Sequence, residues 1–176
     1  MKKLVIATKN LGKLKELKEI LRELPYEIVS MADAGFNEDI EESGATFDEN
    51  ALLKARTVSK ACGEIVLADD SGLMVDFLDG APGIYSARFA GSKATDADNN
   101  TKLLKLLKDV DISDRTAKFV CVIAVVVPDG EELTVKGEWE GTIGFEPRGT
   151  NGFGYDPLFY LPEYGMTAAE LSANTK

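Results

Sequence analysis

Two adjacent carboxylates follow a short apolar run in the middle of the chain. Residues 65–68 are apolar and are followed by Asp69, Asp70, Ser71 and Gly72. A run this short, bounded by a turn signal, predicts a buried strand that ends in a loop. Neighbouring carboxylates repel unless a cation lies beside them, and Mg²⁺ bound through carboxylate oxygens and water would supply that charge. Alternatively, Asp70 or Ser71 only caps a helix or makes an Asx-turn.

Lysines near the start of the chain could bind an anion. Residues 4–7 predict a first buried strand, and a helical pattern that ends at Pro25 follows it, with apolar positions at Leu14, Leu17, Ile20, Leu21 and Leu24. The polar loop between them contains Thr8, Lys9, Asn10, Leu11, Gly12 and Lys13. A loop that enters a helix N-terminus favours anions, and a bound anion would explain a lysine in that first turn. Alternatively, Asn10 only caps the helix and Lys13 is solvated. The glycine spacing of a Walker P-loop is absent.

A third group of polar residues surrounds a second predicted helix. The spacing of Thr46 and Glu49 predicts a capping box, and Gly63 predicts the helix end. The acidic stretch 37–44 before it is expected to be a solvated loop, of which one carboxylate could be a metal ligand. Lys54 lies at the edge of the apolar stripe, which is costly unless it snorkels or meets an anion. An inward Lys54 near Asp69 and Asp70 would fit a phosphate site.

Two later segments could contact a ligand. Arg88 stands among small and aromatic residues, where it could be structural or could clamp a phosphate. The stretch 147–157 combines glycines with Phe153 and Tyr155, and a base stacked on an aromatic ring is stabilised by about 1–3 kcal/mol. Asp156 could accept hydrogen bonds from a purine edge. Alternatively, this is a glycine-shaped turn whose two aromatic rings are buried.

Composition excludes several classes of function. The chain has 176 residues, enough for one domain or a domain of two lobes, and a net charge of −10, which argues against a general nucleic-acid or anionic-membrane surface. It has no histidine, so a Ser-His-Asp triad and a His-ligated zinc site are excluded. Two distant cysteines favour a reducing cytoplasm, and no segment is long enough for a signal peptide or a membrane span.

The remaining patterns predict the fold class. Residues 26–31 and 73–78 predict strands, Thr95 or Asp96 begins a helix, and 118–127 and 133–139 form a hairpin around the turn Pro128-Asp129-Gly130. Strands and helices alternate early and a hairpin follows. We therefore expect an α/β protein with a mixed sheet.

Several motifs in a fixed order resemble one known family. They are Ala7-Thr8-Lys9-Asn10-x-x-Lys13-x-x-Glu16, Glu42-Ser43-Gly44-x-Thr46-Phe47-x-Glu49-Asn50-Ala51 with Lys54-Ala55, Ala68-Asp69-Asp70-Ser71-Gly72-Leu73, Gly80-x-Pro82-Gly83-x-x-Ser86-Ala87-Arg88 and Gly152-Phe153-Gly154-Tyr155-Asp156-Pro157. Together they resemble the inosine/xanthosine triphosphate pyrophosphatases, the Ham-type ITPases, over nearly the whole chain. The resemblance implies a single ITPase-like domain: an elongated mixed β-sheet with flanking helices and two lobes around a central substrate cleft.

The resemblance also implies an activity and a partner. It implies a cytoplasmic homodimer that uses Mg²⁺ to cleave purine nucleoside triphosphates, such as ITP, dITP and XTP, into a monophosphate and pyrophosphate. Carried over by motif, Glu42 and Asp70 hold the metal, and Asp70, Asp69 and Lys13 are catalytic. The residues expected to bind substrate are Thr8, Lys9, Asn10, Leu11, Gly12, Lys13, Lys54, Ser71, Arg88, Phe153, Gly154, Tyr155, Asp156 and Lys176.

One part of the family pattern lies beyond this sequence. The family continues into a Ser-His-Arg motif that helps to read the base, whereas this sequence ends at Lys176. A protein that truly ended there could keep the phosphate chemistry, while its base selectivity and turnover would fall. Two other functions stay open: a Maf-like nucleotide pyrophosphatase that acts on other bases, and a nucleotide-binding module without turnover.

Overall fold

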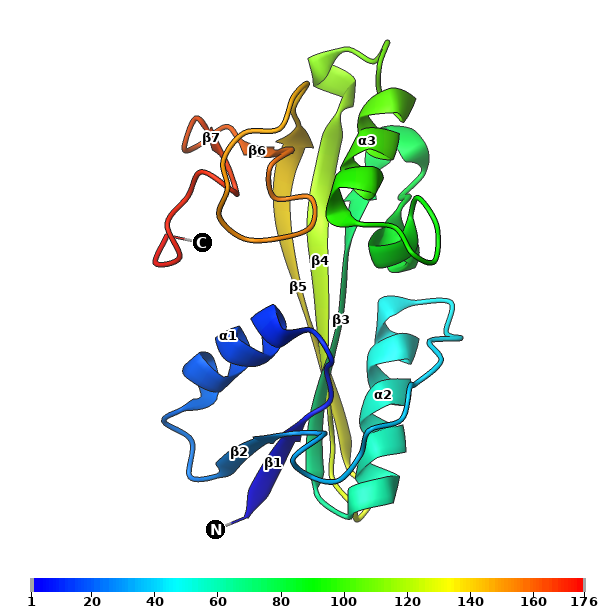
Figure 1. Ribbon diagram of the computed structural model, residues 1–176, viewed down its shortest axis with the longest axis vertical. Helices are drawn as coiled ribbons and strands as arrows, with labels where there is room; N and C mark the ends of the chain where they lie inside the picture. Colours follow the sequence, from blue (N-terminus) through cyan, green and yellow to red (C-terminus); the bar gives the residue numbers. More distant parts are fainter. Residues whose placement is uncertain (1, 176) are drawn as a thin grey trace. The chain divides into compact units, whose positions relative to one another are not determined.

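The structure is a computed structural model that describes residues 2–175 (Figure 1). Its seven strands form one mixed sheet in the order β2-β1-β3-β4-β5-β6-β7. The strands are β1 Lys3–Ile6, β2 Glu27–Ser30, β3 Ile65–Val75, β4 Thr116–Val126, β5 Glu132–Ile143, β6 Phe159–Leu161 and β7 Met166–Thr167. The helices are α1 Leu11–Leu21, α2 Phe47–Cys62 and α3 Asp96–Leu106, with short 3₁₀ turns η1 Asp76–Leu78, η2 Gly83–Arg88 and η3 Ile112–Asp114. The predicted α/β class with a mixed sheet is confirmed.

The chain folds into two compact units. The first unit comprises Met1–Asp70 and Cys121–Gly137, and the second comprises Ser71–Val120 and Glu138–Lys176. Strands β3, β4 and β5 contribute residues to both units.

The first unit is built on parallel strands. Strand β1 pairs in parallel with β2 and with β3. Helices α1 and α2 lie on opposite sides of these strands (Figure 1). Helix α2 begins at the cap Thr46 and ends at Gly63, whose φ of 69° allows the left-handed conformation that terminates a helix. Its predicted apolar stripe is buried at Phe47, Ala51, Ala55 and Val58, whereas Cys62, also predicted there, is half-buried. The cap at Thr46 and the end at Gly63 are confirmed, but Glu49 does not close the predicted capping box, because its Oε2 accepts from the backbone N–H of Ala45.

Helix α1 differs from its predicted packing. None of its residues is fully buried, and Ile20 is 74% exposed although its spacing predicted a place in the core. The helix connects β1 to β2, which is the last strand at this end of the sheet, so little sheet surface lies beneath its apolar face. The polar end of the helix, which begins at Asn10, is the part that the site uses.

Strand β3 corrects two predictions. We expected a strand that ended before Asp69 and a separate strand over 73–78, but Ile65–Val75 is one continuous strand and η1 follows it. Asp69 and Asp70 therefore lie in the middle of a buried strand. A strand can carry two acids there because successive side chains point to opposite faces of the sheet, so each carboxylate can meet its own cation.

The second unit has its own core. Leu73 and Val75 of β3 pack there with Leu103 of α3 and with Phe159 and Leu161 of β6. Helix α3 begins with a complete capping box, in which Thr95 and Asp98 bond each other's backbone N–H groups. Strands β5, β6 and β7 pair antiparallel. The loop between β5 and β6 belongs to the second unit and contains the glycine-rich stretch 147–157.

The predicted hairpin is also confirmed. Strands β4 and β5 are neighbours, and the backbone N–H of Val127 donates to the carbonyl of Glu131 across the turn. Strand β5 extends further than predicted, to Ile143. No helix within residues 2–175 is long and apolar enough to cross a membrane.

Candidate active site

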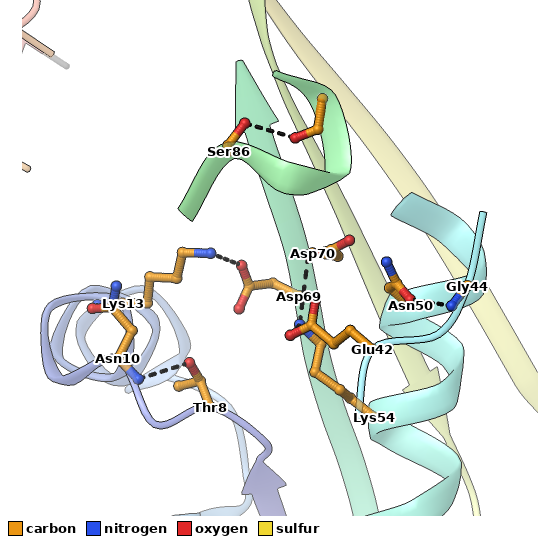
Figure 2. Close-up of polar contacts among 11 residues, drawn as sticks. Thr8, Asn10, Lys13, Glu42, Gly44, Asn50, Lys54, Asp69, Asp70 and Ser86 are labelled. Atoms are coloured by element: carbon orange, nitrogen blue, oxygen red, sulfur yellow. Dashed lines mark hydrogen bonds and ion pairs between the residues drawn. The ribbon is translucent and has the colours of Figure 1, made fainter. Parts of the chain in front are cut away.

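Two buried carboxylates of β3 each meet a lysine from a different helix. Nζ of Lys13 in α1 lies 2.6 Å from Oδ2 of Asp69, and Nζ of Lys54 in α2 lies 3.6 Å from Oδ1 of Asp70. Figure 2 shows the lysines approaching the strand from opposite sides. Both carboxylates are more than 90% buried. Each lysine therefore places a positive charge beside one of these buried carboxylates, where burial of an unpaired charge would be costly.

The start of α1 positions Lys13. The side chain of Asn10 accepts a hydrogen bond from the backbone N–H of Lys13 at 3.1 Å, which makes Asn10 the N-cap. Oγ1 of Thr8 in turn accepts from the backbone N–H of Asn10 at 3.2 Å. Asn10 is thus the N-cap of α1, as the alternative interpretation of the sequence predicted. Lys13 is not a solvated side chain, because it reaches the buried Asp69.

The other predicted residues of this loop are more exposed. Lys9 forms an ion pair with Asp39 of the acidic stretch, and both side chains are at least half exposed. Leu11 and Gly12 are exposed in the first turn of α1. Of these two residues, only the backbone N–H groups are suited to bind an anion at the helix N-terminus.

Lys54 connects two carboxylates. Its Nζ lies 3.2 Å from Oε1 of Glu42 and 3.6 Å from Oδ1 of Asp70, and its side chain is only 14% exposed (Figure 2). This arrangement brings together three residues that the sequence proposed for the metal and the phosphates. The acidic stretch is otherwise mostly exposed, and Glu42 is the member that the fold turns toward the sheet.

Asn50 fixes the loop that carries Glu42. Its Oδ1 accepts a hydrogen bond from the backbone N–H of Gly44 at 2.8 Å. A Cβ at Gly44 would lie 2.6 Å from that oxygen, so only glycine allows this approach. Sequence reasoning gave Asn50 no role. Its signal was available: Asn50 is a polar residue one turn before Lys54, beside the apolar stripe of α2, and it is completely buried.

Asp70 has a perturbed ionisation. Burial raises the pKa of its carboxyl to about 6, and the charge of Glu42 acts in the same direction. The charges of Lys54 and Lys13 and the amide of Asn50 lower this pKa by a smaller amount. Figure 2 shows the Asn50 amide nitrogen pointing toward Asp70, although Oδ2 of Asp70 and Nδ2 of Asn50 both lack a hydrogen-bond partner of regular geometry within residues 2–175.

The donor set fits a small hard cation that keeps much of its water. No group of three or more His, Cys, Asp or Glu side chains within residues 2–175 is arranged to hold a metal. Magnesium, however, is held by one or two carboxylates together with water and substrate phosphates. Glu42 and Asp70 share Lys54, and Oδ2 of Asp70 is a buried oxygen that has no hydrogen-bond partner among residues 2–175. These observations match such a site.

The second unit contains the candidate base-binding residues. Phe153 is 42% exposed, whereas Tyr155 is buried and its hydroxyl donates to the carbonyl of Ser86 at 2.7 Å. Burial raises the pKa of Tyr155. The carboxylate of Asp156 is buried and accepts from the backbone N–H of Phe153 at 3.1 Å. The ring of Tyr155 is thus buried in the core of the second unit, as the alternative interpretation of this loop predicted, and contact of Tyr155 with a base stays a prediction.

Two further predicted residues lie in the second unit. Arg88 is exposed at the end of η2, with its guanidinium 5.1 Å from the ring centre of Tyr85. Ser71 is half-buried and follows Asp70 in β3. Lys176 lies outside the described residues. Among the predicted residues, ion pairs thus join Lys13 to Asp69, and Lys54 to Glu42 and Asp70.

Comparison with known proteins gives consistent matches. The model of the Ham1 family matches residues 4–176. A protein of Bacillus licheniformis named dITP/XTP pyrophosphatase is 52% identical over 176 residues, which cover 100% of this chain and 90% of that protein, and one of Bacillus subtilis with the same name is 51% identical, with 100% and 89% covered. A solved HAM1 protein from Coxiella burnetii superimposes with a TM-score of 0.92 at 47% identity, covering 99% of this chain and 89% of the other. The Ham1 protein of Staphylococcus aureus gives 0.89 at 45%, covering 98% and 88%.

Proposed function

Because the chain belongs to the Ham1 family, we propose that it hydrolyses nucleoside triphosphates with aberrant purine bases. The substrates are ITP, dITP and XTP, and the products are a nucleoside monophosphate and pyrophosphate. Relatives that carry the name dITP/XTP pyrophosphatase share half of their residues with this chain, which supports the proposal.

One observation carries this proposal most directly: two lysines from separate helices neutralise two neighbouring carboxylates of one buried strand. A fold gains little stability from burying such pairs, because desolvation of the charges offsets their attraction. The same groups become useful when a polyphosphate and a cation arrive. The lysines can then turn to the phosphates while the carboxylates turn to the cation.

We further propose that Glu42 and Asp70 hold Mg²⁺. The ion would neutralise phosphate charge and polarise the phosphorus–oxygen bond under attack. The chain's own residues do the rest. Lys13 and Lys54 compensate the charge of the phosphates, and the hydroxyl of Thr8 with the first-turn N–H groups of α1 binds phosphate oxygens. Asp69 keeps Lys13 oriented, because Oδ2 of Asp69 lies only 2.6 Å from Nζ of Lys13.

Asp70 is the base in this proposal. Hydrolysis needs an acceptor for the proton of the attacking water, and the protein has no histidine. In the protein without metal, burial raises the pKa of the Asp70 carboxyl to about 6, so at neutral pH this group is mostly ionised and can accept a proton. No covalent intermediate is required.

Base selection is assigned to the second unit. Phe153 offers a partly exposed ring on which a purine can stack, and Gly154 and Asp156 follow it in the same loop. Selection of a 6-oxo purine over adenine requires donors aimed at that oxygen, because adenine would leave such donors unpaired. A homodimer and a cytoplasmic location also belong to this proposal.

The test is release of pyrophosphate from a panel of triphosphates. Purified protein with Mg²⁺ should release it from ITP, dITP and XTP with a kcat/KM at least tenfold above that for ATP and GTP. Removal of the metal by a chelator should abolish release, and added Mg²⁺ should restore it. Equal rates on ATP would refute the selectivity. A pyrimidine substrate would favour the Maf-like function, and binding without release would favour a non-catalytic module.

A further inference from the structure

Both backbone polar groups of Gly154 form hydrogen bonds with side chains of helix α3. The backbone N–H of Gly154 donates to Oδ2 of Asp96 at 2.8 Å, and its carbonyl accepts from Nδ2 of Asn100 at 3.0 Å. Asp96 and Asn100 are four residues apart, so they lie one above the other on the same face of the helix. Gly154 directly follows Phe153, and its φ of 62° turns the chain there.

A pocket of about 390 Å³ separates part of this loop from α3. Asp96 and Asn100 line it on the helix, and Phe153 and Gly154 line it on the loop. Tyr155, the next residue, is buried in the core, whereas the segment beside the pocket makes fewer of the dispersion contacts that fix a packed segment. The two side-chain contacts at Gly154 hold the loop beside this pocket.

Stability alone does not account for Asn100. The residue is 9% exposed, and its Oδ1 has no hydrogen-bond partner within residues 2–175. A buried amide oxygen without a partner destabilises the folded state, and helix α3 uses leucine at Leu103 and Leu107 to pack its core face. An apolar side chain at position 100 would avoid that cost. The gain that offsets it is the bond to Gly154.

We propose that Asp96 and Asn100 are positioning residues that strengthen binding of the base by fixing the exposed ring of Phe153. This inference rests on the proposed function and names the residues that control its affinity for the base. By holding both sides of Gly154, α3 determines the direction of the preceding residue. The buried contact of Asp156 with the N–H of Phe153 restrains the same segment from the other end. A ring fixed in this way accepts a stacked purine without losing freedom on binding.

The experiment compares clamp variants with a control on the same helix. The clamp variants are Asp96→Ala and Asn100→Ala, alone and together, and Asp96→Asn keeps an oxygen that can accept from Gly154. The matched control is Asp98→Ala, which destroys the capping box of α3 without touching the loop. For each protein we would measure the kcat and KM for ITP and ATP, and the midpoint of thermal unfolding.

Each alanine clamp variant should raise the KM for ITP about tenfold and leave kcat within threefold. Stacking of one base is worth a factor of roughly 5 to 150 in affinity, and interactions that ground and transition states share affect KM. The KM for ATP should rise by a similar factor, because stacking does not distinguish the two bases. The double variant should lose no more than either single variant, because both side chains hold the same residue, Gly154. Asp96→Asn should stay within threefold of the unaltered protein.

The control separates positioning from general destabilisation. Asp98→Ala should lower the unfolding midpoint and leave the KM values for ITP and ATP unchanged. An unchanged KM in Asn100→Ala, or an equal rise of KM in Asp98→Ala, would overturn the inference. The unaltered protein tests the proposed function independently. If it binds ITP without turnover, that function fails, and the clamp is judged by the affinities for ITP and ATP. If it binds neither nucleotide, both fail.

Discussion

Asp70 is subject to two opposing requirements. A carboxylate placed to hold a cation and to accept a proton must be available to both, yet it lies in a buried strand where ionisation is costly. Burial raises its pKa to about 6, and Lys54 compensates the ionised form only in part. The residue that we propose for catalysis is therefore also one that lowers the stability of the metal-free protein at neutral pH.

Asp70→Asn should abolish turnover and leave the fold intact. The substitution removes a metal ligand and the base together, so we expect the rate of pyrophosphate release from ITP to fall at least a thousandfold. Circular dichroism should remain that of the unaltered protein. A rate within tenfold of the original would place the chemistry elsewhere.

At alkaline pH, Asp70→Asn should be more stable than the unaltered protein. In the folded protein the pKa of the Asp70 carboxyl is about 6, which exceeds the 3.8 of an unperturbed aspartate. The protonated carboxyl therefore contributes its full stability below about pH 4, and this contribution is lost as the pH rises through 6. At pH 8 the ionised group costs up to about 3 kcal/mol. In metal-free buffer, urea unfolding of Asp70→Asn should show a gain of that order at pH 8 and none at pH 4. Asp109→Asn, at an exposed position, serves as the control, and an equal gain at both pH values would contradict this account.

Gly44 is a second residue with a specific requirement. An alanine Cβ there would lie 2.6 Å from Oδ1 of Asn50 and 2.8 Å from Cβ of Glu49. Gly44→Ala should displace the loop that carries Glu42 and raise the Mg²⁺ concentration needed for half-maximal rate about tenfold. Gly137→Ala is the matched control, because its Cβ would meet no atom within 4 Å. A normal Mg²⁺ requirement in Gly44→Ala would show that Glu42 is not a ligand.

At the scale of elements, a buried arginine joins the end of α3 to the end of β5. The guanidinium of Arg115 donates to the carbonyls of Leu107, Val110 and Gly144, and it lies 4.0 Å from the ring centre of Phe145. The residue is 1% exposed, and burial lowers the pKa of its guanidinium. The charge is thus solvated by backbone carbonyls, including those that follow a helix C-terminus.

Arg115→Lys should therefore destabilise the protein strongly. A lysine ammonium cannot reach three carbonyls in the geometry of a planar guanidinium, and the carbonyls left unpaired cost about 1–3 kcal/mol each. We expect the free energy of unfolding in urea to fall by at least about 3 kcal/mol. Arg22→Lys, the same exchange at an exposed position, should change it by less than about 0.5 kcal/mol. A loss below 1 kcal/mol at Arg115 would show that water replaces the missing donors.

For the whole molecule, the charge balance limits the partners. The chain has 20 basic and 30 acidic residues, so polymeric nucleic acid should be repelled even though a single nucleotide is bound. A labelled single-stranded DNA of 20 nucleotides should show no change in fluorescence anisotropy at protein concentrations up to about 100 µM in 50 mM salt. Binding that weakens steeply with added salt would reveal a basic surface that the net charge conceals.

The sequence by itself determined the local elements. The helix caps at Thr46 and Thr95, the left-handed Gly63 and the turn before β5 were predictable because they depend on residues within a few positions of one another. The polar motifs also predicted that Lys13, Lys54, Glu42 and the two acids belong to one kind of chemistry.

Only the tertiary structure decided how these residues meet. Lys13 and Asp69 are 56 residues apart, and nothing local specifies that α1 supplies the cation for one face of β3 and α2 for the other. The same holds for Asn50, whose amide became part of the site through a loop that returns to α2, and for Tyr155, whose ring entered the core. Local sequence fixes backbone conformation over a turn or a strand. The partners of a buried charge depend on the packing of distant segments, which sequence spacing does not encode.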